Sequence, residues 1–390
     1  MEKILYDYTI CQEYTPFHGG SEYADTVLTA LLAETAGEGL GVFFWRNRHI
    51  NEGMFEQLRA RKVAFHPLVD IRNIPAIVRS YGYTTIYSAL AHMIDWRVLP
   101  LPADIRCLFT IHGLRAIELA ADGYTKGVDV AEAIAREKAN IYDRVFRPAL
   151  RKTIVTVSDH SKGSILKYYP ETAPSDVVVL YSPPKTVKAT DNKPAGRDVC
   201  AKYSVAENRY GLLVSAGIWY KNALRGIQAY DRLFSENHRQ IPADYRVLVL
   251  GVREADALKA EIANRARFIF SGYVAPDELE SLYACAHTFL YPSLNEGFGY
   301  PPLEAMKYNT VCLCSNSTAI PEVCRDMVLY FDPTSVAEIG ERILQSFDPT
   351  VREGLTVRMQ ETLPLLTARQ ERDLQKLVGL ITGKEGYSAK

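Results

Sequence analysis

Short apolar segments alternate with longer amphipathic segments along most of this chain, and this alternation constrains the fold more than any other feature. Runs of strand length are followed by stretches of helical length from the first residues to about residue 331. Such an order predicts an α/β protein with parallel sheets, because neighbouring parallel strands require a crossover between them. At 390 residues, two domains are the natural expectation.

The expected elements divide the chain into two α/β halves. In the first half we predict a helix over residues 21–35 and strands over 3–10, 42–45, 85–88, 108–111, 154–157 and 177–181. In the second half we predict strands over 210–215, 245–250, 268–270, 288–291, 311–314 and 328–331, and a last helix over 367–381. Residues 182–208 are rich in Pro, Lys, Asp and Ala and show little periodicity. We therefore predict domains at 1–185 and 209–365, a linker at 186–208, and a C-terminal helix within 366–390.

Composition excludes several classes of protein. The net charge of -1 gives no global reason to expect nucleic-acid binding. No apolar run approaches the roughly 20 residues that a membrane span needs, and the first residues lack a signal-peptide pattern, so we expect a cytoplasmic protein. The seven cysteines have no zinc-ligand spacing, which favours free thiols. The clustered glycines at 37–41 follow a helix and precede a strand, the wrong context for a dinucleotide-binding fingerprint.

The segment 295–306 carries two carboxylates, Glu296 and Glu304, around a glycine-rich turn. Gly297 and Gly299 permit a tight turn and a close approach to a ligand. The prolines at 301–302 suit the first turn of a helix, and a helix that begins behind such a turn favours an anion. Carboxylates on both sides of an anion pocket match a nucleotide sugar. Alternatively, Glu304 merely complements a helix dipole and the glycines form an ordinary loop.

Neighbouring segments favour the first interpretation. Tyr291-Pro292-Ser293 precedes the turn, and 315–317 and 320–323 follow it. The region 270–333 resembles the C-terminal half of the retaining glycosyltransferases of family 4, whose hallmark is two glutamates separated by seven residues around a Gly-Phe-Gly core. The resemblance implies a GT-B fold, with two Rossmann-like domains whose parallel sheets face each other across a cleft and a C-terminal helix that crosses back to the first domain.

The resemblance also implies roles in binding a nucleotide-diphosphate sugar. Glu296 is expected to contact the sugar and favour positive charge near the anomeric carbon, and Glu304 to hold the ribose hydroxyls. Because Pro301 and Pro302 lack N–H groups, Tyr300 and Leu303 would supply the free backbone donors. The remaining turn residues that we assign to the donor are Gly297, Phe298 and Gly299.

The segment 215–222 follows the first strand of the second domain, where ligands bind in open α/β sheets. Relatives have Gly-Arg and then Lys-Asn or Lys-Gly here, and these cations neutralise the diphosphate. Lys221 matches the lysine, whereas Ile218 stands where the arginine is usual. Our hypothesis is that Arg225, four residues after Lys221, shares a helix face with it and supplies the second charge. A solvated surface arginine is the alternative.

Further candidates come from other strand ends. His112 follows a first-domain strand, and the resemblance implies that it faces the donor sugar. Gly20, in the segment 18–22, is expected near the donor phosphate, although Ser21 can instead be an ordinary helix cap. Tyr273 and Val274 match the turn that lies against the nucleotide base in relatives. Arg115 and Glu118 are weaker candidates that can contact the acceptor or line the cleft. The segment 158–161 resembles a family segment that is usually Ser-x-x-Ser, and a simple strand-to-helix cap is the alternative.

The resemblance implies sugar transfer with retention at the anomeric carbon, with His112 and Glu296 as the catalytic candidates. We assign no nucleophile and no cofactor. The chain has no Asp-x-Asp triplet, so we expect no obligatory metal; Lys/Arg side chains and helix dipoles would neutralise the diphosphate. GDP-, UDP- and dTDP-linked sugars all remain open as donors.

The acceptor is less constrained, and we expect a glycan or a lipid-linked glycan. The segment 136–152 has six Lys or Arg residues and two acidic ones, which fits either peripheral contact with an anionic membrane or a solvated helix face. Tyr14 and Phe17 can stack on sugars or pack in the core. The leading function is glycosyl transfer in surface polysaccharide or glycolipid assembly. The alternatives are a sugar-nucleotide epimerase of the same fold and a non-catalytic sugar-nucleotide-binding protein.

Overall fold

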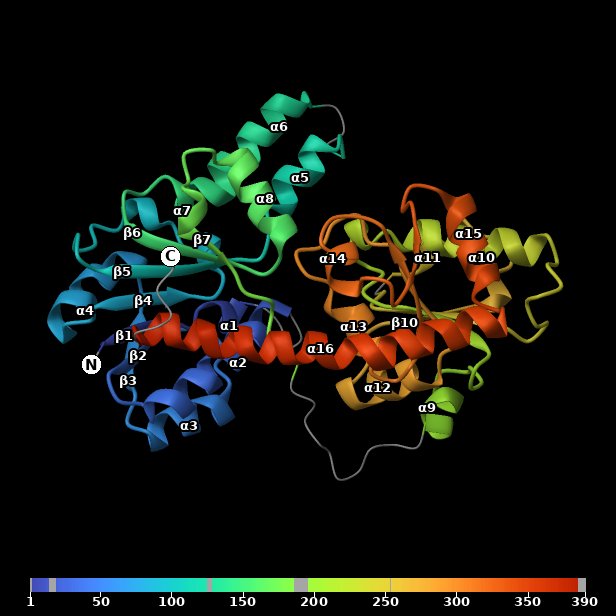
Figure 1. Cartoon of the computed structure of the whole chain (residues 1–390), viewed down its shortest axis with the longest axis horizontal. Helices are drawn as coiled ribbons and strands as arrows, with labels where there is room; N and C mark the ends of the chain where they lie inside the picture. The colour runs from blue at the N-terminus through green and yellow to red at the C-terminus, as the bar shows by residue number, and fades with distance from the viewer. Residues whose placement is uncertain (1, 14–18, 125–127, 186–195, 253, 385–390) are drawn as a thin grey trace. The chain divides into compact units, whose positions relative to one another are not determined.

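The chain folds into two compact units, each built on one parallel sheet with helices around it (Figure 1). The computed structural model describes residues 2–13, 19–124, 128–185, 196–252 and 254–384. The first unit comprises residues up to 187 together with those from 367 onward, and the second comprises residues 188–366. The predicted α/β class with parallel sheets is confirmed.

The first unit has a seven-stranded sheet in the order β3-β2-β1-β4-β5-β6-β7. Its strands are β1 (Ile4–Asp7), β2 (Leu40–Trp45), β3 (Ala64–Leu68), β4 (Thr85–Ser88), β5 (Arg106–Ile111), β6 (Arg151–Thr156) and β7 (Val177–Val179). Its helices are α1 (Ile10–Glu13), α2 (Gly19–Thr35), α3 (Glu52–Ala60), α4 (Ile74–Tyr81), α5 (Arg115–Ala121), α6 (Val130–Glu137), α7 (Asp143–Phe146) and α8 (Asp159–Tyr168). All strand pairs are parallel.

Three elements of the first unit differ from the sequence prediction. The first strand ends at Asp7, and its predicted end belongs to α1. Helix α2 begins at Gly19, so Ser21 lies inside the helix and is not its N-cap. The prediction also missed β3, whose sequence contains Pro67. A proline is tolerated there because β3 is the edge strand, where a missing N–H breaks no ladder.

The second unit has a six-stranded parallel sheet in the order β10-β9-β8-β11-β12-β13. Its strands are β8 (Tyr210–Leu213), β9 (Arg246–Leu250), β10 (Phe268–Ser271), β11 (Thr288–Tyr291), β12 (Val311–Ser315) and β13 (Leu329–Phe331). Its helices are α9 (Gly196–Lys202), α10 (Ala223–Ser235), α11 (Asp256–Ala260), α12 (Pro276–Cys285), α13 (Tyr300–Met306), α14 (Ile320–Cys324) and α15 (Val336–Gln345). All six predicted strands of this unit are found within a few residues of their expected ends.

Part of the predicted linker is helical. Helix α9 packs against α12 through the buried Val199 and Cys200. Glu278 on α12 accepts hydrogen bonds from Lys202 and from the Tyr203 hydroxyl. The composition of residues 196–208 resembles a linker, but two apolar side chains and one ion pair are enough to fix a helix onto the unit.

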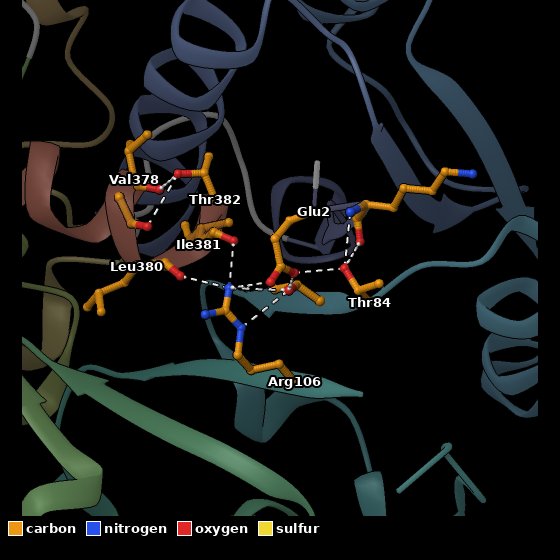
Figure 2. Close-up of polar contacts among 10 residues, drawn as sticks. Glu2, Thr84, Arg106, Val378, Leu380, Ile381 and Thr382 are labelled. Atoms are coloured by element: carbon orange, nitrogen blue, oxygen red, sulfur yellow. Dashed lines mark hydrogen bonds and ion pairs between the residues drawn. The ribbon is translucent and has the colours of Figure 1, made fainter. Parts of the chain in front are cut away.

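The last helix, α16 (Pro349–Thr382), is longer than predicted and ends in the first unit. The Gln370 side chain donates to the backbone oxygen of Ser182, and Asp373 accepts from the Tyr181 N–H. At the helix terminus, Arg106 on β5 donates to the carbonyls of Leu380 and Ile381, as Figure 2 shows. A cation at a helix C-terminus satisfies carbonyls that have no partner within the helix.

None of the helices in the described ranges is both long enough and apolar enough to cross a membrane.

Candidate active site

Three loops of the second unit meet at the carboxyl ends of β8, β11 and β12. These strands are neighbours in the sheet, so the loops that follow them share one edge. The main-chain N–H of Leu294, after β11, donates to the carbonyl of Tyr220, after β8, over 2.8 Å. The N–H of Glu296 donates to the Thr318 hydroxyl, after β12, over 2.9 Å. The sheet order alone therefore brings together segments that lie about a hundred residues apart.

Lys221 is the cation of this edge. It ends the 3-10 turn η6 (Trp219–Lys221), and Asn222 follows it in the left-handed region with φ 58°. The Lys221 ammonium donates to Glu296 Oε1 over 2.6 Å and to the Tyr291 hydroxyl over 2.9 Å. It also lies 5.1 Å from the centroid of the Tyr291 ring. These contacts hold the positive charge at a defined point beyond β8.

Glu296 is the carboxylate of the same edge, and it is buried with 6% of its surface exposed. Besides Lys221, its Oε1 atom accepts a hydrogen bond from Ser293 over 2.6 Å. Ser293 is itself held because its carbonyl accepts from Ser315 over 2.6 Å. A buried carboxylate with a close cation and a hydroxyl donor has its orientation fixed before any ligand arrives.

Glycine is required at one position behind this edge. A Cβ atom on Gly217 would lie 2.5 Å from the carbonyl oxygen of Gly251, after β9. The two backbones touch here, since the Gly217 N–H donates to that oxygen over 3.1 Å. The close approach lets the loop after β8 turn sharply toward Lys221.

The predicted glycine turn and helix start are present. Gly299 is the N-cap of α13 with φ 106°, a conformation that side chains rarely adopt, and the two prolines occupy its first turn. Phe298 and Leu303 are buried, and the rings of Phe298 and Tyr300 lie 5.3 Å apart.

Glu304 lies on α13 and is half-buried. It is close enough to Tyr283 to add to the increase in that hydroxyl's pKa, which burial causes in the main. Gly297 is also half-buried. The glycine turn and α13 connect Glu304 along the chain to Glu296 and so to the Lys221–Glu296 pair.

The predicted pairing of Arg225 with Lys221 on one helix face is wrong. Lys221 belongs to η6, whereas Arg225 lies on α10, and the left-handed Asn222 separates the two elements. Arg225 donates to the Asn222 side-chain oxygen over 2.7 Å. The Asn222 amide in turn donates to the carbonyls of Pro292 and Pro333. Arg225 thus supports the loops behind the edge, and its role toward a diphosphate stays a prediction.

Tyr273 and Val274 follow β10, the edge strand that is separated from β8 by β9. The Tyr273 side chain is 64% exposed, and Val274 is half-buried. Partial burial raises the pKa of Tyr273, with Asp277 as the lesser cause. Their assignment to the nucleotide base remains a prediction.

In the first unit, His112 follows β5 as predicted. Its Nε2 atom lies 3.0 Å from the carbonyl oxygen of Ala89, and its ring meets Tyr23 edge to face with centroids 4.6 Å apart. Tyr23 belongs to α2, whose second residue is the buried Gly20. His112 and the start of α2 are therefore held next to each other within this unit. His18, Tyr14 and Phe17 lie outside the described residues.

Glu118 and the segment 158–161 form a second polar cluster in the first unit. Glu118 accepts from His160 over 2.8 Å and from Ser164. Ser158 caps α8 by accepting from the Ser161 N–H over 3.1 Å. The cap interpretation of this segment is thus confirmed.

The predicted basic face at 136–152 does not point outward as a whole. Lys152 donates to the carbonyls of Val145, Phe146 and Pro148, and burial lowers its pKa. Lys138 donates to the carbonyl of Tyr168, whereas Arg147 pairs with Asp143 and is 64% exposed. The periodicity of charge in a sequence does not distinguish a lysine that caps a helix from one that faces solvent.

Four supporting residues were missed, namely Tyr291, Ser293, Thr318 and Asn222. Tyr291 ends β11 and the other three are common polar residues of loops, and only their position at the same edge of the sheet distinguishes them. Ser293 and Tyr291 lie within the segment that carried the family resemblance, so that segment already contained a usable signal.

The chain has the same fold as several solved structures. The lipopolysaccharide glycosyltransferase WaaG has a TM-score of 0.66 at 16% identity, with 97% of this chain and 100% of that chain covered. Sucrose-phosphate synthase from Thermosynechococcus elongatus has a TM-score of 0.69 at 15% identity, with 98% and 99% covered. HepE from Anabaena, in complex with UDP-glucose, has a TM-score of 0.64 at 12% identity, with 97% and 99% covered. The fold is GT-B, as predicted.

Sequence comparisons agree with this fold. Residues 204–349, which lie in the second unit, match the family model described as glycosyl transferases group 1. The chain is 37% identical over 217 residues to O-antigen chain mannosyltransferase B of Escherichia coli, which covers 53% of this chain and 55% of that protein. It is 29% identical over 182 residues to O-antigen chain mannosyltransferase RfbU of Salmonella typhimurium, with 47% of each covered. The match thus spans about half the length of these relatives.

Proposed function

We propose that this protein is a retaining glycosyltransferase of family 4. It moves a hexose from a nucleotide-diphosphate donor to a glycan or lipid-linked glycan acceptor in surface polysaccharide or glycolipid biosynthesis. The observation that carries the proposal is the Lys221–Glu296 pair, with N···O 2.6 Å, at the carboxyl edge of the second sheet. The glycine turn that leads to Glu304 follows directly behind the pair.

The chemistry of transfer explains why such a pair is useful. As the bond between sugar and diphosphate breaks, negative charge grows on the departing phosphate and positive charge grows at the anomeric carbon. Lys221 would stabilise the first charge and Glu296 the second, more strongly in the transition state than before it. Arg225, Gly20 and the backbone at Tyr300 and Leu303 remain proposed donor contacts, and His112 a proposed contact to the sugar.

Mannose is the hexose that the relatives favour, since both curated relatives described above are named mannosyltransferases. GDP-mannose is accordingly the first donor to test, with UDP- and dTDP-sugars beside it. We propose transfer without an obligatory metal ion, because the sequence lacks an Asp-x-Asp triplet and offers Lys221 and Arg225 instead. Complete loss of transfer on chelation would contradict this.

The test is the thermal stability of the full chain with GDP, UDP and dTDP and their sugars. A ligand at about 100 times its Kd stabilises the folded state by roughly 2.7 kcal/mol. We expect a shift in melting temperature with one nucleotide, which Glu304→Ala reduces. The matched control is Glu341→Ala, an exposed glutamate on α15, which should leave the shift unchanged.

Turnover then distinguishes the remaining functions. If the sugar of an α-linked donor is transferred to an acceptor and the product is also α-linked, the proposal is supported. Release of an altered free sugar nucleotide would indicate an epimerase. Donor binding without turnover over a broad set of acceptors would indicate a binding protein, and no shift with any nucleotide would contradict the donor site itself.

A further inference from the structure

A group of basic side chains gathers at the carboxyl end of β5 in the first unit, outside the donor residues proposed above. His92 lies on the 3-10 turn η2 (Ala91–Met93), Arg115 begins α5, and Arg144 lies on α7. The turn η2 packs against β5, against α7 and against the π-helical turn η4 (Lys138–Tyr142). The fold thus places in one region three basic residues that are separated by 23 and 29 positions along the chain.

Two nitrogen atoms of this group are buried and unsatisfied. His92 Nδ1 and Arg144 Nε are buried, and neither has a hydrogen-bond partner among the described residues. Arg144 also forms no ion pair with a carboxylate in the described part of the chain. Buried nitrogen donors without partners are costly, and native proteins rarely keep them unless a ligand, ion or water satisfies them.

The pKa of His92 is lowered by burial and by neighbouring basic groups. Burial is the largest cause that lowers the pKa of His92 to about 3, and the positive charges of His112, Arg144 and Arg115 contribute the rest, in that order. The ring of His92 also lies 5.6 Å from that of Tyr142 on η4. The field at His92 is therefore positive and opposes a further proton.

The carboxylates on the surrounding elements already have partners. Asp95 accepts from Arg97, Glu118 accepts from His160 and Ser164, Asp143 accepts from Arg147 and Tyr169, and Glu137 pairs with Arg136. Of these, Asp95 is the one whose pKa Arg144 helps to lower, although its hydrogen bonds to Arg97 contribute more. Among the described residues, Arg144 is thus left without a carboxylate partner of its own.

We propose that His92, Arg115 and Arg144 form a subsite for a phosphate group of the acceptor. A phosphate oxygen accepts charge-assisted hydrogen bonds from guanidinium groups and an imidazole, which would satisfy the two buried nitrogens. That the ligand is the acceptor rests on the proposed transferase function, whereas the binding of a phosphate group at this subsite does not. The phosphate can belong to a soluble sugar phosphate or to a lipid-linked glycan, and both present the same chemistry.

The direct test follows the His92 imidazole by NMR in the full chain while inorganic phosphate is added. A bound anion favours the protonated ring, so the pKa of His92 should rise with saturation. His287 is an internal control, because burial also lowers its pKa to about 3, yet it lies in the other unit and its Nδ1 is 3.2 Å from the Tyr245 hydroxyl. A rise at His92 but not at His287 supports the subsite. Equal rises, or no saturable change, overturn it.

Two variants separate a specific subsite from general attraction. Arg144→Gln should weaken phosphate binding about tenfold or more, as expected for loss of a hydrogen bond from a charged group. Arg136→Gln removes the same charge from α6, where the arginine is half-exposed and paired with Glu137, and should change affinity by less than about twofold. Equal losses in both variants would contradict the proposal, and their melting temperatures check that both fold.

The source of the phosphate is decided by a third measurement. Glucose 1-phosphate in solution and phosphatidylglycerol vesicles are each tested for the Arg144-dependent change at His92. A response to either one supports the subsite and identifies its source, and a response to neither overturns it. If phosphate binds but no sugar transfer occurs, the subsite stands and the transferase proposal fails. If nucleotides bind at Glu304 but phosphate does not bind, the transferase proposal stands and the subsite fails.

Discussion

Two buried polar regions of this protein differ in whether their charged and polar groups have partners. Around Glu296, each charge has a partner, since Lys221, Ser293 and Tyr291 form one bonded group. Around His92, burial leaves Arg144 Nε and His92 Nδ1 without partners among the described residues. A completed network stabilises the fold and fixes geometry, whereas an incomplete one costs stability and favours a ligand. The difference separates a site that is organised in advance from one that a ligand would complete.

Among the substitutions, breaking the Lys221–Glu296 pair should give the largest effect. Both side chains are nearly buried, with 12% and 8% exposed, so Lys221→Met leaves an unpaired carboxylate. We expect a loss of about 3 kcal/mol in the free energy of unfolding. Urea unfolding measures it, and the double variant Lys221→Met with Glu296→Gln should recover most of the loss. If Lys221→Met were as stable as the wild type, the pairing around Glu296 would not stabilise the fold, and the two regions would not differ in this respect.

Acid should destabilise the protein through His92 and His287. The pKa of each is lowered to about 3 from 6.5, mainly by burial, so only the unfolded chain takes up their protons in that window. The two histidines therefore make their full contribution to the free energy of unfolding above pH 6.5. This contribution falls toward pH 3, by up to about 1.4 kcal/mol per pH unit for each histidine.

The two histidines should respond differently to ligand and mutation. His287→Gln should reduce the slope of unfolding free energy against pH, as measured by urea unfolding at several pH values. Phosphate should reduce the part of the slope that belongs to His92 and leave the part due to His287. An unchanged slope in His287→Gln would contradict the assignment.

Replacing Arg106 should give a smaller loss. This side chain satisfies two carbonyls at the end of α16 and lies 3.8 Å from Glu2 (Figure 2). Arg106→Met should lower the free energy of unfolding by about 1.5 kcal/mol. The control is Arg72→Met, since Arg72 is 76% exposed and pairs with Asp70 at the surface. Equal effects in the two variants would mean that the helix terminus gains nothing from Arg106.

The smallest change is expected at Arg144. Because its Nε is buried without a partner, Arg144→Met removes a desolvation cost together with a charge. We expect stability within about 0.5 kcal/mol of the wild type, or higher. A large loss would mean that Arg144 is a structural residue. The same unfolding series as for Lys221→Met makes the comparison direct.

The fold was largely predictable because the alternation of apolar and amphipathic segments is a local property. The strands at 85–88 and 288–291 were predicted to the residue, since both are short, buried and bounded by polar turns. Strand β3 and helix α9 were missed for the opposite reason. A proline at a sheet edge and a helix inside a linker-like composition become visible only through the elements on which they pack.

The site was predictable where function depends on special residue types in a fixed spacing. Gly299, the two prolines and Glu304 lie where the sequence predicts them, because left-handed backbone and helix starts are local requirements. Arg225 was placed wrongly because a single left-handed residue, Asn222, ends the periodicity on which the inference depended.

The sequence by itself determined the α/β class, the glycine turn and the pair of glutamates, since each rests on backbone conformation or periodicity within a short segment. Only the tertiary structure decided that Ser293 and Lys221 hold Glu296, that Lys152 caps a helix, and that His92 and Arg144 share a buried region. The physical reason is that burial and pairing depend on which strand ends are neighbours, and the order of strands in a sheet is not the order along the chain.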